Sequence, residues 1–457
     1  MNFKTTGIMA LVLAIGIVAV VLLNKQDEKK EEAEDIESKL LNIEKEDVTE
    51  IILQPSGIHC VKDSTEWKIV SPVETDGDKS SIDAIANMFS WANIERTISS
   101  DPAEYGVYGL NPDQGKLILI HSEGADTLYL GDKSPTGSFV FARKSGSPDV
   151  FLTTTSLQSN IEKKLFDLRD KTVLGFEKNQ VRSFDLKNVN GSFSLAKESG
   201  EWKIKSPGEY EADETEIDKV LNRLNSERAK EFVDEAPGDV RQYGLSDPGV
   251  QVDLMLGENR AKKTLLIGAL DGDRYYAKDE SRAPVFQVDS AFVSILNPDL
   301  YTLRLKDLAD FSNSDVNRFE LEFSGQTIVC SKDTSGTWMI LKPESRKAKS
   351  WKISSITREA SQLEVVEFVD DAPSSLDKYG LSAPKVRAKF FVNDVLQLDV
   401  FLGEEKGDNV YAKVAGSESV YLVEKKVLET WRPSLEDIAE EPQQVEEEAE
   451  TETTLDQ

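Results

Sequence analysis

The sequence is poor in the residues that carry out most protein chemistry. Its 457 residues include only two cysteines, Cys60 and Cys330, and two histidines, His59 and His121. This scarcity excludes a zinc site built from cysteine and histidine ligands. The chain also contains no Gly-x-Ser-x-Gly nucleophile elbow and no His-Glu-x-x-His metalloprotease motif. We therefore predict that the protein is not an enzyme, with no catalytic, cofactor-binding or metal-binding residues and no small-molecule substrate.

Two short segments look like ligand motifs but lack the spacing that such motifs need. Residues 131–134 (Gly-Asp-Lys-Ser) resemble part of a phosphate loop, yet the preceding glycine lies seven residues away. Successive backbone N–H groups therefore cannot surround a phosphate. Residues 271–273 (Asp-Gly-Asp) lack the later ligands of a calcium loop, and they favour a hairpin turn.

Basic residues are outnumbered, and the acids gather at one end. The formal net charge is -29, and Glu436 to Gln457 hold ten acids and no base. Because phosphate binding needs clustered lysine and arginine, we expect no nucleic-acid partner. Residues 433–457 are predicted to form a disordered acidic tail.

The chain has one long apolar run, near its N-terminus. Twenty uncharged residues separate Lys4 from Lys25, and about 20 residues of helix span the hydrocarbon core of a bilayer. A cleaved signal peptide is the alternative, but its apolar stretch is shorter and ends in a small-x-small site, which is missing here. We predict a transmembrane anchor over residues 1–25 and a charged linker over 26–39.

The rest of the chain repeats one pattern three times. Trp-Lys-Ile-x-Ser-Pro occurs at 67–72 and 202–207, and a looser copy, Trp-Met-Ile-Leu-Lys-Pro, at 338–343. Tyr-Gly-Leu follows at Tyr108, Tyr243 and Tyr379, spaced by 135 and 136 residues. Leu/Ile-Gly and then an aromatic residue, alanine and a base recur in the same register. These landmarks predict three repeat modules, at 40–171, 172–307 and 308–432.

The periodicity within a module predicts an α+β fold: a mainly antiparallel β module with two helices, preceded in the whole chain by one transmembrane helix. Short alternating runs such as 181–186 indicate half-buried strands. Apolar residues at helical spacing follow each Trp-x-Ile run, as in Ile217, Val220, Leu221 and Leu224, with Asp213 and Glu216 as a capping box ahead of them. A second, closing helix is predicted over about 157–168.

Each repeated motif has a structural interpretation that we favour. In Tyr-Gly-Leu, glycine supplies a positive φ at a turn, and three identical ligand sites are less plausible than three identical turns. Trp67, Trp202 and Trp338 are predicted to anchor the cores. The basic residues that follow alanine are expected on solvated strand faces, with a row of partner-binding residues as the alternative. They are Arg143, Lys278 and Lys413.

Position within the repeat also suggests roles for other residues. Arg169 and Arg304 fall where one module ends and the next begins, so we predict that they bridge modules. Cys60 and Cys330 occupy nearly equivalent strands of different modules, and we expect two free, buried thiols.

The order of these motifs resembles the uncharacterised "domain of unknown function 4340" family over roughly residues 40–430. The third module departs from the pattern at its Trp motif and at its end, where Trp431-Arg432-Pro433 replaces Leu-Arg-x-Lys. The resemblance implies a membrane-anchored protein associated with ABC-type transporter components of the gliding-motility type. It also implies that the bulk of the chain lies outside the cytoplasm, on the cell (inner) membrane, although the flanking lysines alone would favour the opposite orientation.

These observations give three functional hypotheses. The first is a non-enzymatic, extracytoplasmic accessory or scaffold protein that binds a membrane protein complex. The second is a module protein that binds envelope polysaccharide or lipid through exposed aromatic residues such as Trp91, Trp351 and Tyr275. The third is a hydrolase with a nonstandard site, which would need a deep pocket lined by paired carboxylates.

Overall fold

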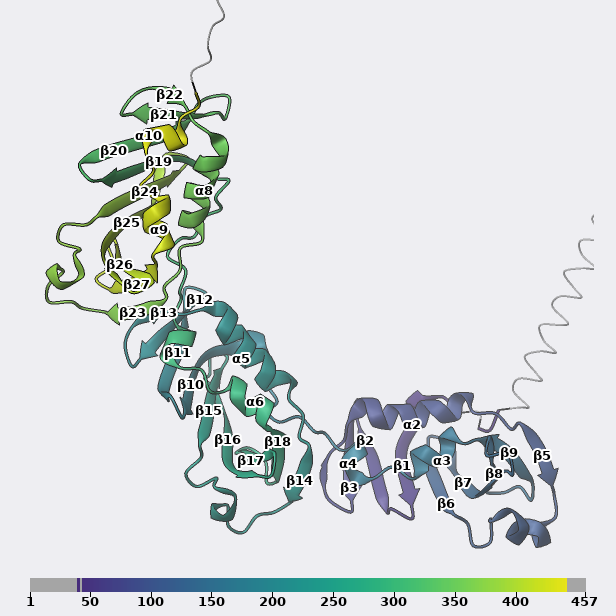
Figure 1. Cartoon of the computed structure of the whole chain (residues 1–457). Coiled ribbons are helices and arrows are strands. Elements are labelled where there is room, and N and C mark those ends of the chain that lie inside the picture. The colour runs from purple at the N-terminus through teal and green to yellow at the C-terminus, as the bar shows by residue number, and fades with distance from the viewer. Residues whose placement is uncertain (1–38, 42, 442–457) are drawn as a thin grey trace, which may run out of the picture. The chain divides into compact units, whose positions relative to one another are not determined.

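The computed structural model of the chain describes residues 39–41 and 43–441, and each of three successive modules contains one nine-stranded antiparallel sheet (Figure 1). The strand order is the same in all three sheets. It is β4-β3-β2-β1-β6-β7-β8-β9-β5 in module one, β13-β12-β11-β10-β15-β16-β17-β18-β14 in module two and β22-β21-β20-β19-β24-β25-β26-β27-β23 in module three. The predicted triplication is therefore confirmed.

The strands and helices of module one are β1 (Val48–Gln54), β2 (Ile58–Asp63), β3 (Glu66–Ser71), β4 (Thr75–Asp76), α2 (Lys79–Trp91), β5 (Arg96–Ser99), β6 (Gly115–His121), β7 (Gly124–Lys133), β8 (Phe139–Lys144), β9 (Val150–Thr154), α3 (Ser156–Ile161) and α4 (Leu165–Leu168). Those of module two are β10 (Val181–Asn188), β11 (Gly191–Glu198), β12 (Glu201–Ser206), β13 (Tyr210–Glu211), α5 (Glu214–Ser226), β14 (Glu231–Asp234), β15 (Val250–Leu256), β16 (Ala261–Asp271), β17 (Arg274–Asp279), β18 (Val285–Asp289), α6 (Ser290–Ile295) and α7 (Leu300–Leu303).

Those of module three are β19 (Val316–Phe323), β20 (Gln326–Lys332), β21 (Trp338–Lys342), β22 (Arg346–Lys347), α8 (Ser350–Ser361), β23 (Glu367–Asp370), β24 (Val386–Val392), β25 (Val395–Lys406), β26 (Asn409–Val414), β27 (Val420–Glu424), α9 (Lys426–Thr430) and α10 (Leu435–Ile438). Short 3-10 turns precede β1, β10 and the strand after each Tyr-Gly-Leu motif.

The longest helix of each module packs its apolar side on the sheet. In α2 the buried residues Ile82, Ile85 and Phe89 belong to the same core cluster as Trp67, as their helical spacing predicts. Asp78 caps this helix by accepting a hydrogen bond from the Ser81 backbone N–H at 2.8 Å. The predicted core role of all three tryptophans is confirmed, since Trp67, Trp202 and Trp338 are buried.

The Tyr-Gly-Leu turns have the predicted left-handed glycines, with φ between 66° and 70° at Gly109, Gly244 and Gly380. The structure also links this motif to the Leu/Ile-Gly motif. A Cβ atom on Gly268 would lie 2.1 Å from the carbonyl oxygen of Tyr243, and the equivalent glycines of the other modules are equally crowded. A side chain cannot fit at Gly268 or at its equivalents. The turn therefore needs glycine for its positive φ, and the strand behind the turn needs glycine for the close contact.

The predicted closing helix of 157–168 is wrong in one respect, because it is two short helices, α3 and α4. The apolar residues Leu157, Ile161, Leu165 and Leu168 keep helical spacing through the break, so the sequence pattern did not reveal that the helix is interrupted. In the other modules a proline, Pro298 or Pro433, occupies the equivalent gap, where a helix cannot continue. Within the residues that the structure describes, each module thus has three α-helices rather than two.

The end of module three also differs from our prediction. The equivalent of Leu168-Arg169 is Ile438-Ala439, since Ala439 pairs with Ala348 as Arg169 pairs with Gly77. Ile438 and Ala439 are buried, so the module continues beyond 432 and the first residues of the predicted tail are folded. Trp431 instead lies in the core, where its indole N–H donates to the Ile356 carbonyl at 3.3 Å.

The predicted anchor (1–25), most of the linker (26–38) and the remainder of the tail (442–457) lie outside the described residues. Within 39–41 and 43–441, no helix has the length and apolar character needed to cross a membrane. Contacts group the chain into two compact units whose division runs through module two. The junction of modules one and two falls inside the first unit and that of modules two and three inside the second, so each can be described by itself.

Candidate functional site at the module junctions

A buried polar site in the first unit surrounds Arg169, the residue that directly follows α4. The backbone holds this residue against the edge of its own module. Asp78 N–H donates to the Leu168 carbonyl at 2.7 Å, and Asp170 N–H donates to the Asp76 carbonyl at 2.8 Å. The residue is only 2 % exposed, and its side chain contacts Thr75 of its own module as well as the next module.

The Arg169 guanidinium binds two groups of module two at once. Nη1 and Nη2 donate to the two carboxylate oxygens of Glu235 at 2.5 and 3.1 Å. The same plane lies over the Phe232 ring, with Cζ 3.4 Å from the ring centroid. A planar fork that pairs with a carboxylate and stacks on an aromatic ring is the geometry that arginine provides and lysine does not.

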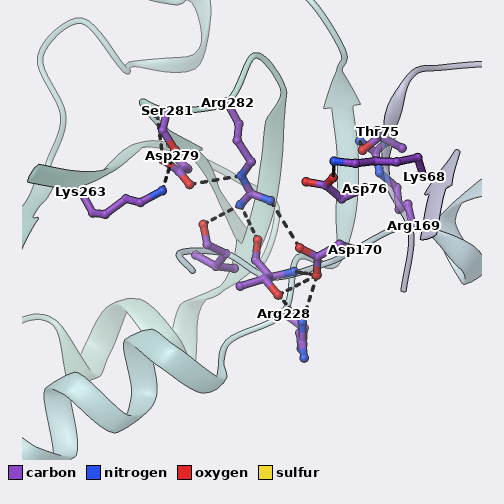
Figure 2. A network of polar contacts seen from close by, with 12 residues as sticks. Lys68, Thr75, Asp76, Arg169, Asp170, Arg228, Lys263, Asp279, Ser281 and Arg282 are labelled. Carbon is purple, nitrogen blue, oxygen red and sulfur yellow. Dashed lines mark hydrogen bonds and ion pairs between the residues drawn. The ribbon is translucent and has the colours of Figure 1, made fainter. Parts of the chain in front are cut away.

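A second set of contacts fixes the chain that leads from module one into module two (Figure 2). Asp170 Oδ1 accepts hydrogen bonds from the backbone N–H and the hydroxyl of Thr172, at 2.9 and 2.6 Å, and from Arg228 Nη1 at 3.2 Å. Arg282 donates to the carbonyl oxygens of Thr172 and Val173, and it is held by Asp279 at 3.2 Å. The connecting segment is therefore bound at several points rather than loose.

The second unit repeats the arrangement around Arg304. Its Nη1 and Nη2 donate to the carboxylate oxygens of Asp371 at 3.1 and 2.8 Å. Its guanidinium lies between the Tyr210 and Phe368 rings, with Cζ 3.8 and 3.6 Å from the two centroids. The predicted bridging role of Arg169 and Arg304 is thus confirmed. We call each constellation of arginine, acid and aromatic ring a joint.

Electrostatics stabilises the charged form of the acid in the second joint. Burial alone would raise the pKa of Asp371, but the hydrogen bonds and positive charge of Arg304 outweigh it, so the pKa is lowered. Burial, with a hydrogen bond to Asp371, raises the pKa of the Tyr210 phenol. Both shifts favour an ionised carboxylate beside a neutral phenol and a permanent guanidinium cation.

A cavity lies at each joint, with a volume of about 550 Å³ beside Arg169 and about 450 Å³ beside Arg304. Five carboxylates line the first cavity, and three of them, Asp76, Asp170 and Glu235, are each paired with a base, whereas Asp63 and Glu74 also line it. A general acid or base needs a proton-accepting group aimed at a substrate, and the three paired groups are aimed at arginine and lysine.

The joint is absent at both ends of the array. Module three has Ala439 in place of the joint arginine. Module one has Thr97 and Ser100 where module two has Phe232 and Glu235, at offsets of 135 residues. Each junction between two modules thus has both halves of a joint. Module one lacks the aromatic residue and the acid that would receive an arginine, and module three lacks the arginine.

The basic residues after alanine do not form a row of free cations. Lys278 Nζ donates to the carbonyl oxygens of Arg282 and Ala283, and burial lowers its pKa. Lys413 Nζ donates in the same way to the Ser417 carbonyl. In module one Arg143 lies over the Tyr129 ring, 3.6 Å from the centroid. Each residue is half-buried and supports its own module, so neither solvated faces nor a binding row describes them well.

The aromatic residues considered for ligand binding are not gathered in one cleft. Trp91 and Trp351 are exposed, but they belong to different modules, one at the end of α2 and the other in the first turn of α8. Tyr275, in β17, is half-buried. None of the three lines the cavities at the joints.

Two other predictions are confirmed. Cys60 and Cys330 are free and buried, and burial raises the pKa of each thiol to about 12. Residues 271–273 form the hairpin turn between β16 and β17, with Gly272 at φ 64°. Among residues 39–41 and 43–441, no three His, Cys, Asp or Glu side chains gather closely enough to hold a metal ion.

Sequence reasoning found the joint arginines but missed their partners. The available signal was Glu-Phe-Val-Asp followed by an acid, Ala and Pro, at 231–237 and 367–373. This string is shared by modules two and three only, which is the pattern expected of a group that receives the preceding module. Module one reads Arg-Thr-Ile-Ser-Ser at the same place.

A family model described as "Domain of unknown function (DUF4340)" matches the chain three times, at residues 67–203, 202–384 and 338–442. Together these matches cover most of the chain. The chain belongs to the DUF4340 family. The matches to DUF4340 begin at Trp67, Trp202 and Trp338, the same core tryptophan in each module. Comparisons with curated proteins and with solved structures found no match.

Proposed function

We propose that this DUF4340 protein is a non-enzymatic scaffold, anchored in the cell (inner) membrane by residues 1–25, with its modules outside the cytoplasm. It acts as an accessory protein to a membrane complex, of the ABC-type transporter or envelope-export class that the family resemblance implies. It binds this partner through the surfaces of its modules.

One observation supports this proposal above the others: the two buried basic residues of the described chain, Arg169 and Arg304, both connect modules. Arg169 and Arg304 each bind an acid and an aromatic ring of the next module. Ion pairs of this kind hold surfaces in a fixed register. A chain whose two buried basic residues both connect modules is suited to presenting the surfaces of several modules to one partner.

Affinity capture tests the proposal. A tag at the C-terminus is used to purify the full chain from detergent-solubilised membranes, with a chain lacking residues 1–25 as the matched control. We expect a membrane protein complex to be retained by the full chain in constant ratio and to be reduced or lost with the control. Recovery of the full chain without any membrane partner would contradict the scaffold function.

Orientation needs its own measurement, because the flanking lysines and the family resemblance point to opposite sides. Protease treatment of intact and opened cells, with detection of the C-terminal tag, gives it. We expect the tag to be cleaved once the outer barrier is opened while the inner membrane remains sealed. Protection under that condition would place the modules in the cytoplasm.

Binding of envelope polysaccharide or lipid is the second candidate, favoured by exposed Trp91 and Trp351, which are 56 % and 66 % exposed. Changing each tryptophan to alanine, alone and together, would separate the two functions. Loss of polysaccharide or vesicle binding with retained capture of the membrane complex would favour the second candidate as an additional activity. Unchanged binding would exclude these residues as the binding site.

A further inference from the structure

The sheet of module one carries apolar residues on both of its faces. Helices α2, α3 and α4 all contribute to the core on one face, together with Leu117 and Leu119 of β6 (Figure 1). The alternating residues of the same strands, Ile52 of β1 and Ile118 and Ile120 of β6, lie on the opposite face and are half-buried. An antiparallel sheet that packs on one side only has polar residues on its other side. We call the side of this sheet that carries Ile52, Ile118 and Ile120 the open face.

The other two modules have charged residues where the open face is apolar. Ile52 and Ile118 lie opposite each other in the pairing of β1 with β6. In module three the same two positions hold Glu320 and Lys389, whose side chains form an ion pair at 3.4 Å. Module two has an aspartate at each of these positions. The apolar pair is therefore a feature of module one and not of the repeated fold.

Two cations border the isoleucines of the open face. Lys116 of β6 lies opposite Tyr129 of β7, which lies opposite Arg143 of β8. Arg143 Cζ is 3.6 Å and Lys116 Nζ is 6.0 Å from the centroid of the Tyr129 ring. Among the residues that the structure describes, neither cation is paired with an acid. Stacking on the ring thus leaves both positive charges without a counter-ion.

Module three supplies the counter-ion that module one lacks. Arg387, at the position of Lys116, donates from Nε and Nη2 to the carboxylate oxygens of Asp399 at 3.0 and 2.8 Å. The residue of module one at the position of Asp399 is Thr127, as the strand pairing shows. The open face of module one therefore joins an apolar centre to two cations that can still bind an acid.

These features define the chemistry of an occupant. Apolar side chains would cover the isoleucines, and a carboxylate would pair with the cations. An anionic bilayer fits this face poorly, because the isoleucines are half-buried within a sheet and the net charge of -29 repels anionic lipids. A protein segment can lie across the strands, as α2 does on the other face (Figure 1).

We propose that the open face of module one binds a segment of the protein partner in which apolar residues lie beside an acid. The apolar side chains cover Ile52, Ile118 and Ile120, and the acid pairs with Lys116 and Arg143. This inference rests on the proposed scaffold function, and it adds which module makes the contact and which chemistry the bound segment has.

Site-specific cross-linking in intact membranes identifies the occupant. A photoreactive benzophenone amino acid replaces Ile120 in the full chain, and it replaces Met255, the equivalent residue of module two, in the control. We expect at least about tenfold more protein adduct from position 120, with an attached peptide that contains apolar residues and Asp or Glu. A lipid adduct, a peptide without acids, or equal yields from the two positions would overturn the proposal.

An exchange of residues between modules tests the open face while keeping a compatible cross-strand pair. Ile52→Glu with Ile118→Lys gives module one the ion pair of module three, and circular dichroism checks that the variant is folded. We expect the amount of membrane complex retained in affinity capture to fall at least about tenfold. The matched control, Glu320→Ile with Lys389→Ile in module three, should retain as much complex as the wild type.

Thr127→Asp tests the cations separately, because it gives Lys116 the acid that Arg387 has in module three. We expect the retained complex to fall on the order of threefold and to depend less on salt. If the wild type retains no membrane complex, the scaffold function fails and the docking site fails with it. If the wild type and the Ile52→Glu, Ile118→Lys variant retain the complex equally, the docking site alone is overturned.

Discussion

At the scale of single residues, the joints depend on the shape of arginine as well as on its charge. Arg304 makes two parallel hydrogen bonds to Asp371 and lies between two rings. Lysine in this place would keep the positive charge, but its ammonium group could not form two parallel hydrogen bonds or stack on the rings. The repeat spacing alone identified both joint arginines, whereas the acids remained hidden because module one lacks them.

Arg304→Lys should therefore destabilise the contact between modules two and three. We expect a loss of about 1–3 kcal/mol in the free energy of unfolding, since a half-exposed pair is partly screened. Chemical denaturation measured by tryptophan fluorescence would show it. Arg241→Lys, in an exposed pair with Asp239, is the control and should change stability by less than about 0.5 kcal/mol. Equal effects of the two variants would contradict the special role of Arg304.

The lowered pKa of Asp371 predicts a dependence on pH. A carboxylate whose pKa lies below its unfolded value, near 3.9, stabilises the fold fully above that value. This contribution is lost as the pH falls through the folded-state pKa. The difference in unfolding free energy between the wild type and Asp371→Asn should therefore shrink as the pH falls from about 5 to about 2. A difference that stays constant over this range would contradict the assigned ion pair.

At the scale of elements, alternation and helical spacing predicted most strands and the long helices correctly. The closing helix shows where this reasoning failed. Leu157, Ile161, Leu165 and Leu168 keep one face in register across a break, so spacing could not reveal it. The prolines at the equivalent positions of the other modules carried the missing information, and comparing the three copies would have exposed the break.

Lys163→Pro should accordingly be tolerated. Residue 163 lies between α3 and α4, and Pro298 and Pro433 hold the same place. We expect a change in unfolding free energy between zero and a gain of about 1 kcal/mol, because proline restricts the unfolded chain. Ser159→Pro is the control: it removes the hydrogen bond from Ser159 N–H to the Thr155 carbonyl and should cost about 3 kcal/mol. A large loss for Lys163→Pro would show that the gap is not equivalent in the three modules.

At the scale of the whole molecule, the modules were predictable but the ends of the array were not. The third module seemed to end at Trp431-Arg432-Pro433 because that string also contains arginine before a break. The true equivalent, Ile438-Ala439, carries neither the arginine nor the lysine of the motif, so only the backbone pairing of Ala439 with Ala348 identifies it. Both terminal modules lack half of a joint.

This arrangement predicts that the chain does not assemble head to tail. Light scattering of a chain of residues 39–457 should give a single-chain mass over a wide concentration range. The triple variant Ala439→Arg, Thr97→Phe and Ser100→Asp restores both halves of a joint, and it should associate as concentration rises. Ala439→Arg alone is the control and should not, because the receiving phenylalanine and acid are still missing. Association of the unmodified chain would contradict the prediction.

The even spacing of the joints means that the protein can be shortened by a whole repeat without creating a new kind of surface. Removing residues 172–306 would join Lys171 to Asp307, one full period later. Arg169 would then meet Phe368 and Asp371, and the new joint would have one acid and one aromatic ring, as the first joint of the original chain has. The length of such a chain can therefore change by whole modules, while each junction between modules keeps its arginine, its acid and an aromatic ring.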